Sequence, residues 1–148
     1  MSSREPLSIG QAARWSCILE VCAPKAGNVH PGASFADVTW RDFVRSADAI
    51  APILNEARER GVGQTILDCV KATKEAVGKN TNLGIILLLA PLCAVDRTTA
   101  LGKGIGPVLG SLTVRDAELA YEAIRMARPG GLGDVSSEDV ASPPTMTL

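Results

Sequence analysis

Residues 20–37 gather several side chains that can do chemistry. This stretch holds two carboxylates, Glu20 and Asp37, together with Lys25, Asn28 and the single histidine of the chain, His30. Carboxylate oxygens are good Mg²⁺ ligands, and Mg²⁺ commonly joins them to the phosphates of a nucleotide. Lysine and asparagine donate hydrogen bonds to phosphate, and a histidine can act as a general base. These residue types predict a site for a phosphorylated ligand, with Glu20 and Asp37 as metal ligands.

The same side chains also have ordinary structural explanations. Asp37 would cap a turn, and Glu20 would pair with Lys25 instead of a metal. The length of the stretch argues for a site, because links between helices usually span about 2–8 residues and longer ordered loops are often functional. Gly27 and Gly32 would let the backbone approach a ligand closely. Spacing alone leaves both interpretations open.

A second polar cluster, Lys79-Asn80-Thr81-Asn82, directly precedes a strongly apolar segment. If a helix begins there, its free N–H groups and positive dipole end attract anions, so Asn80, Thr81 and Asn82 are candidate phosphate ligands. Asparagine and threonine are also common N-cap residues, which is the alternative explanation. Two asparagines around a threonine exceed what one cap needs, so a binding function stays open.

A third cluster consists of Arg125 and Arg128 before the glycine-rich segment 129–133. Guanidinium groups can hold phosphate through paired hydrogen bonds, which makes Arg125 a further candidate ligand. The alternative is a helix C-terminus, where the dipole favours cations and the glycines stop the helix. Asp139, in the acidic stretch that follows, is an additional Mg²⁺ candidate.

Helical patterns surround these clusters, and they predict an all-α, multi-helix bundle around a buried apolar helix at about 83–95. The bundle forms a single domain, residues 1–148, with an acidic, proline-rich tail at 134–148. Caps, glycines and prolines set the other boundaries. The first predicted helix is capped by Ser8 and ends near Cys22, with Ile18, Val21 and Cys22 along one apolar face and Trp15 a turn earlier. The others are one over about 40–60 that Pro52 kinks or splits, one ending near Val77, a weak or broken one within 98–110, and a Thr113-capped one ending near Arg128.

Composition narrows the class of protein. Of the 148 residues 46% are hydrophobic and 21% are charged, which is typical of a globular domain. A net charge of −1 argues against a nucleic-acid binder. The apolar segment is shorter than the roughly 20 residues of a membrane span, and the N-terminus lacks the apolar core of a signal peptide. The four cysteines form no CxxC pair, so we expect buried, reduced thiols, no zinc site and a cytoplasmic location.

Three segments together resemble the triphosphoribosyl-dephospho-CoA synthase family. The first contains Pro24-Lys25-Ala26-Gly27-Asn28-Val29-His30 and Ser34-Phe35-Ala36-Asp37, the second is Asn80-Thr81-Asn82-Leu83-Gly84, and the third runs from Ala123-Ile124-Arg125 to Pro129-Gly130-Gly131-Leu132-Gly133. Their order and spacing carry the resemblance, which spans roughly residues 12–140.

The resemblance implies an all-helical enzyme that uses Mg²⁺, ATP and 3′-dephospho-CoA. The 2′-hydroxyl of the acceptor attacks C1′ of ATP, adenine leaves, and a prosthetic-group precursor forms. Carried onto this chain, the resemblance makes Glu20 and Asp37 the metal ligands. They and His30 are also the candidate catalytic residues. The phosphate-binding residues would be Lys25, Asn28, Asn80, Thr81, Asn82 and Arg125.

The chain departs from the family pattern at a few positions. In the citrate-lyase members a proline stands in place of Ala26, Leu-Val-Asp in place of Asn28-Val29-His30, and His-Lys in place of Asn82-Leu83. Family members are usually longer, so we expect this chain to correspond to the N-terminal part of the family fold, with a missing C-terminal half or a homo-oligomer completing it. The alternatives are a non-catalytic ligand-binding or helical assembly protein, and a related nucleotide-processing transferase of another cofactor pathway.

Overall fold

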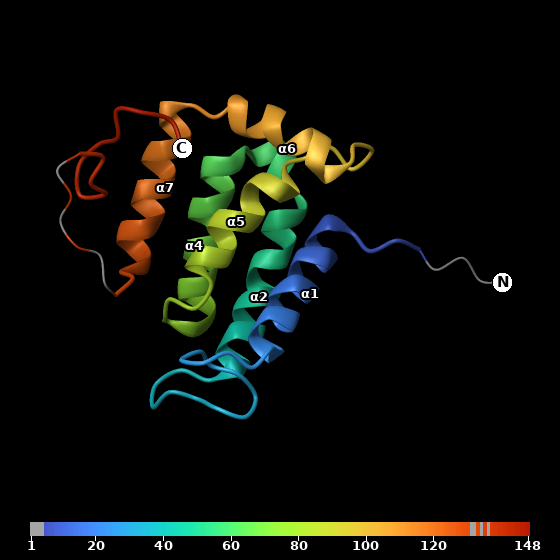
Figure 1. Ribbon diagram of the computed structural model, residues 1–148, viewed down its shortest axis with the longest axis vertical. Coiled ribbons are helices and arrows are strands. Elements are labelled where there is room, and N and C mark those ends of the chain that lie inside the picture. The colour runs from blue at the N-terminus through green and yellow to red at the C-terminus, as the bar shows by residue number, and fades with distance from the viewer. Residues whose placement is uncertain (1–4, 131–132, 134, 136) are drawn as a thin grey trace.

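The computed structural model describes residues 5–130, 133, 135 and 137–148, and this part of the chain consists of helices without a strand. The all-α prediction is therefore confirmed. Figure 1 shows α1, α2, α4, α5 and α7 packed side by side, with α6 across one end of the bundle. The helices are α1 Ile9–Cys22, α2 Trp40–Asn55, α3 Ala57–Arg60, α4 Val62–Val77, α5 Leu83–Cys93, α6 Leu101–Gly110 and α7 Val114–Ala127.

Both ends of α1 follow from its sequence. The Ser8 hydroxyl accepts a hydrogen bond from the backbone N–H of Gln11 at 3.1 Å, and the Gln11 side chain accepts one from the N–H of Ser8 at 2.8 Å. This reciprocal arrangement is the predicted capping box. The helix ends at Cys22 because Ala23 takes the extended conformation that a following proline, Pro24, requires.

The buried face of α1 differs from the prediction. Trp15 is 48% exposed and Cys22 is exposed, whereas the buried positions are occupied mainly by small residues. Small side chains bring α1 close to α2: a Cβ on Gly10 would lie 2.3 Å from the carbonyl oxygen of Ala51. An indole at this contact would hold the two helices apart. The fully buried residues are Gly10, Ala13, Cys17 and Val21.

The cysteines follow the prediction with one exception. All four are free thiols, and Cys17, Cys69 and Cys93 are buried while Cys22 is exposed. Burial raises the pKa of Cys69 to about 12 and that of Cys17 to about 11, so both stay protonated at neutral pH.

The predicted helix over 40–60 is split, but the break does not lie at Pro52. Pro52 remains inside α2, and the chain leaves the helix at Glu56 before the short α3 begins. Gly61 then takes a positive φ of 84° between α3 and α4, and Gly78 ends α4 in the left-handed region. These conformations favour glycine, so they explain why the helices stop there.

Helix α5 begins at Leu83, as predicted, and contacts α1, α2, α4 and α7 in the middle of the bundle. Its fully buried positions are Ile86, Ala90 and Cys93, which repeat at helical spacing. Leu88 is 64% exposed on another side. The helix is thus central, with its burial concentrated on one face.

The segment 98–110 was predicted to be weak or broken, and this is wrong. Helix α6 is continuous from Leu101 to Gly110 and contains Pro107. A Cβ on Gly104 would lie 2.3 Å from Cγ1 of Val95, so this glycine allows α6 to pack against the end of α5. Close packing thus explains Gly104, whereas a Cβ at Gly102, Gly106 or Gly110 would meet open space.

The three polar clusters are carried to one end of the bundle. The 23–39 loop after α1, the 78–82 connection between α4 and α5, and the C-terminal end of α7 lie together at the end opposite α6 (Figure 1). None of the helices in the described part of the chain is long and apolar enough to span a membrane.

The packing predicts how two glycines differ in tolerance. Gly10→Ala should destabilise the protein by about 1–3 kcal/mol, because the new methyl group would overlap a backbone carbonyl on α2. Gly106→Ala is the matched control: its Cβ meets open space, and alanine should stabilise α6 by up to about 1 kcal/mol. Urea unfolding measures both, and equal effects of the two substitutions would contradict the described α1–α2 contact.

Candidate functional site

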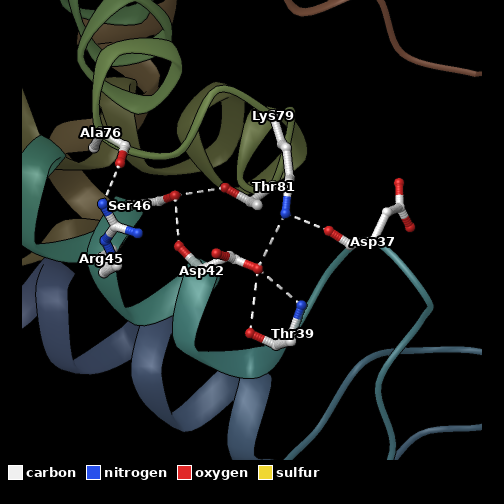
Figure 2. A network of polar contacts seen from close by, with 8 residues as sticks. All are labelled: Asp37, Thr39, Asp42, Arg45, Ser46, Ala76, Lys79 and Thr81. Carbon is white, nitrogen blue, oxygen red and sulfur yellow. Dashed lines mark hydrogen bonds and ion pairs between the residues drawn. The ribbon is translucent and has the colours of Figure 1, made fainter.

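Asp42, in the first turn of α2, is the centre of a polar network at the site end of the bundle (Figure 2). One of its carboxylate oxygens accepts hydrogen bonds from the N–H of Thr39 at 2.9 Å and from the Thr39 hydroxyl at 3.2 Å. The ammonium group of Lys79 lies 3.5 Å from the same oxygen. Chiefly because of the Thr39 N–H, the pKa of Asp42 is lowered from its ordinary value of 3.8. The carboxylate therefore stays charged and joins two loops.

Lys79 extends this connection to the first loop. Its ammonium group also donates to the backbone carbonyl of Asp37, while the Asp37 carboxylate points away from the network (Figure 2). From the other side, the Arg45 guanidinium donates to the carbonyl of Ala76 at 2.7 Å, near the end of α4. The network thus fixes the 78–82 connection against the 37–39 segment and the start of α2.

Thr81 is held by a pair of hydroxyl groups. Ser46, fully buried on α2, donates to the carbonyl of Asp42 at 2.8 Å, and its Oγ lies 2.6 Å from Oγ1 of Thr81. A hydroxyl has one hydrogen, so Thr81 must be the donor to Ser46. The Thr81 hydroxyl is therefore not free to donate to a phosphate as well, and its observed role is to dock the loop.

A pocket of about 390 Å³ opens between the first loop and the start of α5. We call it the loop pocket. Its lining combines apolar side chains, two phenylalanines among them, with polar side chains and glycine backbone. Its apolar residues are Val29, Phe35, Val38, Phe43 and Ile85, and its remaining residues are Glu20, Gly27, Asn28, Asn80, Thr81 and Gly84.

The N-terminus of α5 faces this pocket. The N–H of Ile86 makes the first backbone bond of the helix, to the carbonyl of Asn82 at 2.8 Å, so the N–H groups of the preceding residues have no partner within the helix. Gly84 and Ile85 carry two of these N–H groups and line the pocket. A Cβ on Gly84 would meet open space, so nothing shields this backbone from a ligand. The pocket therefore contains a helix N-terminus with unpaired N–H donors, a feature that favours anions.

Glu20 lines the loop pocket, but its carboxylate is paired with the ammonium group of Lys25, which was the alternative to metal binding. Both side chains are about 40% exposed, at 38% and 42%. Asp37 is exposed and does not line the pocket. Among the described residues no group of three or more His, Cys, Asp or Glu side chains could hold a metal. A metal here would take one or two protein carboxylates, with phosphate and water as its other ligands.

His30 belongs to a tight turn of the first loop. It pairs with Ala33 through two backbone hydrogen bonds of 2.9 Å, and its Nδ1 accepts the N–H of Gly32 at 3.2 Å. With Nδ1 engaged as an acceptor, the neutral ring carries its proton on Nε2. His30 in this arrangement can donate a hydrogen bond through Nε2–H but offers no free nitrogen lone pair, and it is not among the residues that line the loop pocket.

The three asparagines named as ligands occupy different places. Asn28 and Asn80 are exposed and line the loop pocket. Asn82 is 1% exposed, and both atoms of its side-chain amide lack a hydrogen-bond partner in the described structure. Buried amides are normally satisfied by protein or water. Asn82 therefore lies beneath the site and outside the walls of the loop pocket.

The two arginines of the third cluster separate. Arg125 faces the tail, where it donates to the carbonyl of Val140, so the structure does not bring it to the loop pocket. Arg128 lines a different pocket, between α4, α5 and α7. The Asp139 carboxylate accepts from the N–H groups of Val135 and Ala141, a structural role in the tail. From the glycine-rich segment and the acidic stretch after it, Gly131, Leu132 and Asp134 lie outside the described residues.

Several site residues were not predicted from the sequence. Phe35 and Phe43 read as ordinary apolar residues, and Ser46 as a small residue within a helix. The sequence gives little indication of the role of Ser46, because its hydrogen-bond partner Thr81 lies on a distant loop whose position depends on the fold. Gly84 was detectable in principle, because a glycine in the first turn of a strongly apolar helix loses stability relative to alanine and so suggests a need for backbone access.

Comparison with known families gives a match to the family CitG, described as ATP:dephospho-CoA triphosphoribosyl transferase. The match covers residues 6–148, nearly the whole chain, and so includes all three polar clusters. It agrees with the resemblance seen in the sequence. No curated protein and no solved structure matched the chain.

The Asp42 network predicts a specific pH dependence. Asp42→Asn should destabilise the protein by about 1 kcal/mol at pH 7, because it removes the negative charge that holds Thr39 and Lys79. The Asp42 pKa is lowered in the folded protein, so its contribution is complete above the ordinary value of 3.8 and is lost as the pH falls through the lower, folded value. Thermal unfolding from pH 7 to pH 2 should therefore show the wild type and the variant converging in acid. A difference that stays constant across this range would contradict the assignment.

Proposed function

Because the chain belongs to the CitG family of ATP:dephospho-CoA triphosphoribosyl transferases, we propose that it transfers the triphosphoribosyl group of ATP to 3′-dephospho-CoA. The acceptor 2′-oxygen forms a bond to C1′ of ATP as the bond from C1′ to N9 of adenine breaks. The hydroxyl proton is released, and adenine leaves after taking up a proton. The observation that carries the proposal in this structure is the loop pocket, whose lining includes two phenylalanines and the first turn of α5.

The apolar lining residues suit the adenosine part of ATP. Phe35, on the loop, is 54% exposed, and Phe43 of α2 lines the same pocket. An aromatic ring gains stacking and apolar contact with a base, worth about 1–3 kcal/mol per base in proteins that bind single strands. A volume of about 390 Å³ lies within the usual range for small-ligand pockets. Adenine held by these residues would leave the triphosphate to reach α5.

The polar lining residues suit the triphosphate. The N–H groups of Gly84 and Ile85 offer donors at the positive end of the α5 dipole. The exposed amides of Asn28 and Asn80 add donors from the two loops. Thr81, whose hydroxyl is engaged with Ser46, would contribute its backbone and its position. The phosphates would thus be held by groups that the Asp42 network has already fixed.

The ion pair between Glu20 and Lys25 can open when a ligand binds, so that each side chain contacts the ligand instead of the other. An ion pair this exposed contributes at most about 1 kcal/mol, so a ligand can separate it at little cost. Glu20, at the end of α1, would then coordinate Mg²⁺, and Lys25 would contact phosphate. Asp37 does not line the loop pocket, so it would have to turn towards the pocket to act as a second ligand. Bound Mg²⁺ would supply charge neutralisation of the triphosphate. The donor set fits this ion, which keeps several waters and needs only one or two protein carboxylates.

We do not propose His30 as a general base. Its Nδ1 lone pair is occupied by Gly32, so its Nε2–H is the group available to a ligand. We propose it as a hydrogen-bond donor to a part of the substrate that extends beyond the loop pocket, because His30 is not one of the lining residues. Asn82, buried under the start of α5, would fix the helix terminus through ordered water.

The reaction gives a direct test. Protein, ATP, Mg²⁺ and 3′-dephospho-CoA should release free adenine in amounts equal to the transferred product, measured by chromatography, and omission of the acceptor or addition of EDTA should stop the release. Glu20→Gln should reduce turnover about 100-fold or more, whereas Glu75→Gln, an exposed residue of α4 outside the pocket, should have no effect. Absence of adenine while ATP still binds would reject dephospho-CoA as the acceptor.

The helix terminus gives a second test, which separates binding from folding. Gly84→Ala adds a methyl group in open space and replaces a helical glycine, so the free protein should be unchanged or up to about 1 kcal/mol more stable. The same methyl would project at the proposed phosphate position and weaken ATP binding about tenfold or more. Calorimetric titration with Mg²⁺-ATP measures this, with Gly102→Ala of α6 as the matched control. Unchanged ATP affinity in Gly84→Ala would remove α5 from the phosphate site.

A further inference from the structure

A second pocket, of about 310 Å³, lies on the other side of the 78–82 connection. We call it the basic pocket. It is formed where the ends of α4 and α7 meet the start of α5. It is lined by Val70, Thr73, Lys74, Gly78, Lys79, Asn80, Leu83, Ile86, Met126, Ala127 and Arg128.

The basic pocket carries three cations and no carboxylate among its lining residues. Lys79 is shared with Asp42, but no described carboxylate pairs with Lys74 or Arg128. Like charges at one cavity repel each other, and an anion between them would convert this repulsion into attraction. Guanidinium and ammonium groups bind phosphate directly, without a metal.

Arg128 is held in an unusual conformation. It ends α7 with φ 47° and ψ 56°, in the left-handed region where glycine is the usual residue, and Pro129 follows it. A non-glycine residue in this region costs roughly 1–2 kcal/mol. The turn therefore presents an arginine side chain at a position where glycine would be more stable.

Thr73 adds a polar group without a partner. It is 3% exposed, it lines the basic pocket, and its hydroxyl makes no hydrogen bond in the described structure. A buried hydroxyl without a partner costs about 1–3 kcal/mol. The pocket is also lined by apolar residues, including Leu83, Ile86 and Met126. This mixed lining suits a ligand with an extended, mainly aliphatic chain that carries a few polar atoms.

We propose that the basic pocket binds the diphosphate of the acceptor nucleotide, 3′-dephospho-CoA, through direct ion pairs with Lys74 and Arg128. The inference rests on the proposed function and assigns the two substrates to two pockets. The loop pocket contains the Glu20 carboxylate and suits a metal-bound triphosphate, whereas the basic pocket suits a diphosphate without a metal. Asn80 lines both pockets, so the two nucleotides would meet across its side chain.

Direct binding of 3′-dephospho-CoA without ATP tests this assignment. Arg128→Gly removes the guanidinium and places glycine at a positive φ, so the fold should be retained or stabilised. This variant and Lys74→Gln should each weaken 3′-dephospho-CoA binding about tenfold or more, with Mg²⁺-ATP affinity changed less than about twofold. Lys71→Gln is the matched control, one turn away on α4, exposed and outside the pocket. EDTA should leave 3′-dephospho-CoA binding unchanged.

The possible results separate the two proposals. If the wild type binds no 3′-dephospho-CoA, both the proposed function and this inference fail. If it binds with unchanged affinity in Arg128→Gly and Lys74→Gln, only the pocket assignment fails. A selective loss of ATP affinity in these variants would also overturn it, because the triphosphate would then occupy the basic pocket. Melting temperatures identify a variant that does not fold, and Lys74→Gln then decides the question.

Discussion

The ionised carboxylate of Asp42 joins the two loops on which the candidate site depends. It accepts two hydrogen bonds from Thr39 at the start of α2 and faces the ammonium group of Lys79 at 3.5 Å. Lys79 in turn donates to the carbonyl of Asp37. The network thereby brings the first loop to the N-terminus of α5, although the two segments are about forty residues apart in the chain. Both pockets are lined in part by the 78–82 connection, which this network holds in place.

The same segment shows how local sequence limits a site prediction. The caps at Ser8 and Thr39 and the start of α5 follow from residue types a few positions apart, so the sequence predicts them well. Which asparagine of the 78–82 connection faces a ligand depends on tertiary packing. Asn80 lines both pockets, whereas Asn82 is buried. Composition assigned the two residues the same role, and only the docking of the loop on α2 distinguishes them.

Packing also explains the errors in the fold. Hydrophobicity favours Trp15 as the buried residue of α1, but the distance between α1 and α2 is set by Gly10, which leaves no space for an indole. In the same way the glycines of 98–110 suggested a weak or broken helix plus a turn, whereas Gly104 allows a continuous α6 to contact Val95. Arg125 and Arg128 looked equivalent because they are close in sequence. The left-handed turn after Ala127 separates them, and a helical pattern contains no information about that turn.

The two pockets suggest what the replacement of the family's lysine by Leu83 changes in this chain. Where the resemblance would place a lysine, Leu83 contributes an apolar side chain to the basic pocket. The cationic residues of that pocket come instead from Lys74, Lys79 and Arg128, on α4, its following connection and the end of α7. An anion held this way lies between helices and not at the tip of α5 alone. In the proposed assignment the terminal N–H groups of α5 remain available to the loop pocket, so the two phosphorylated substrates would bind on two sides of one helix start.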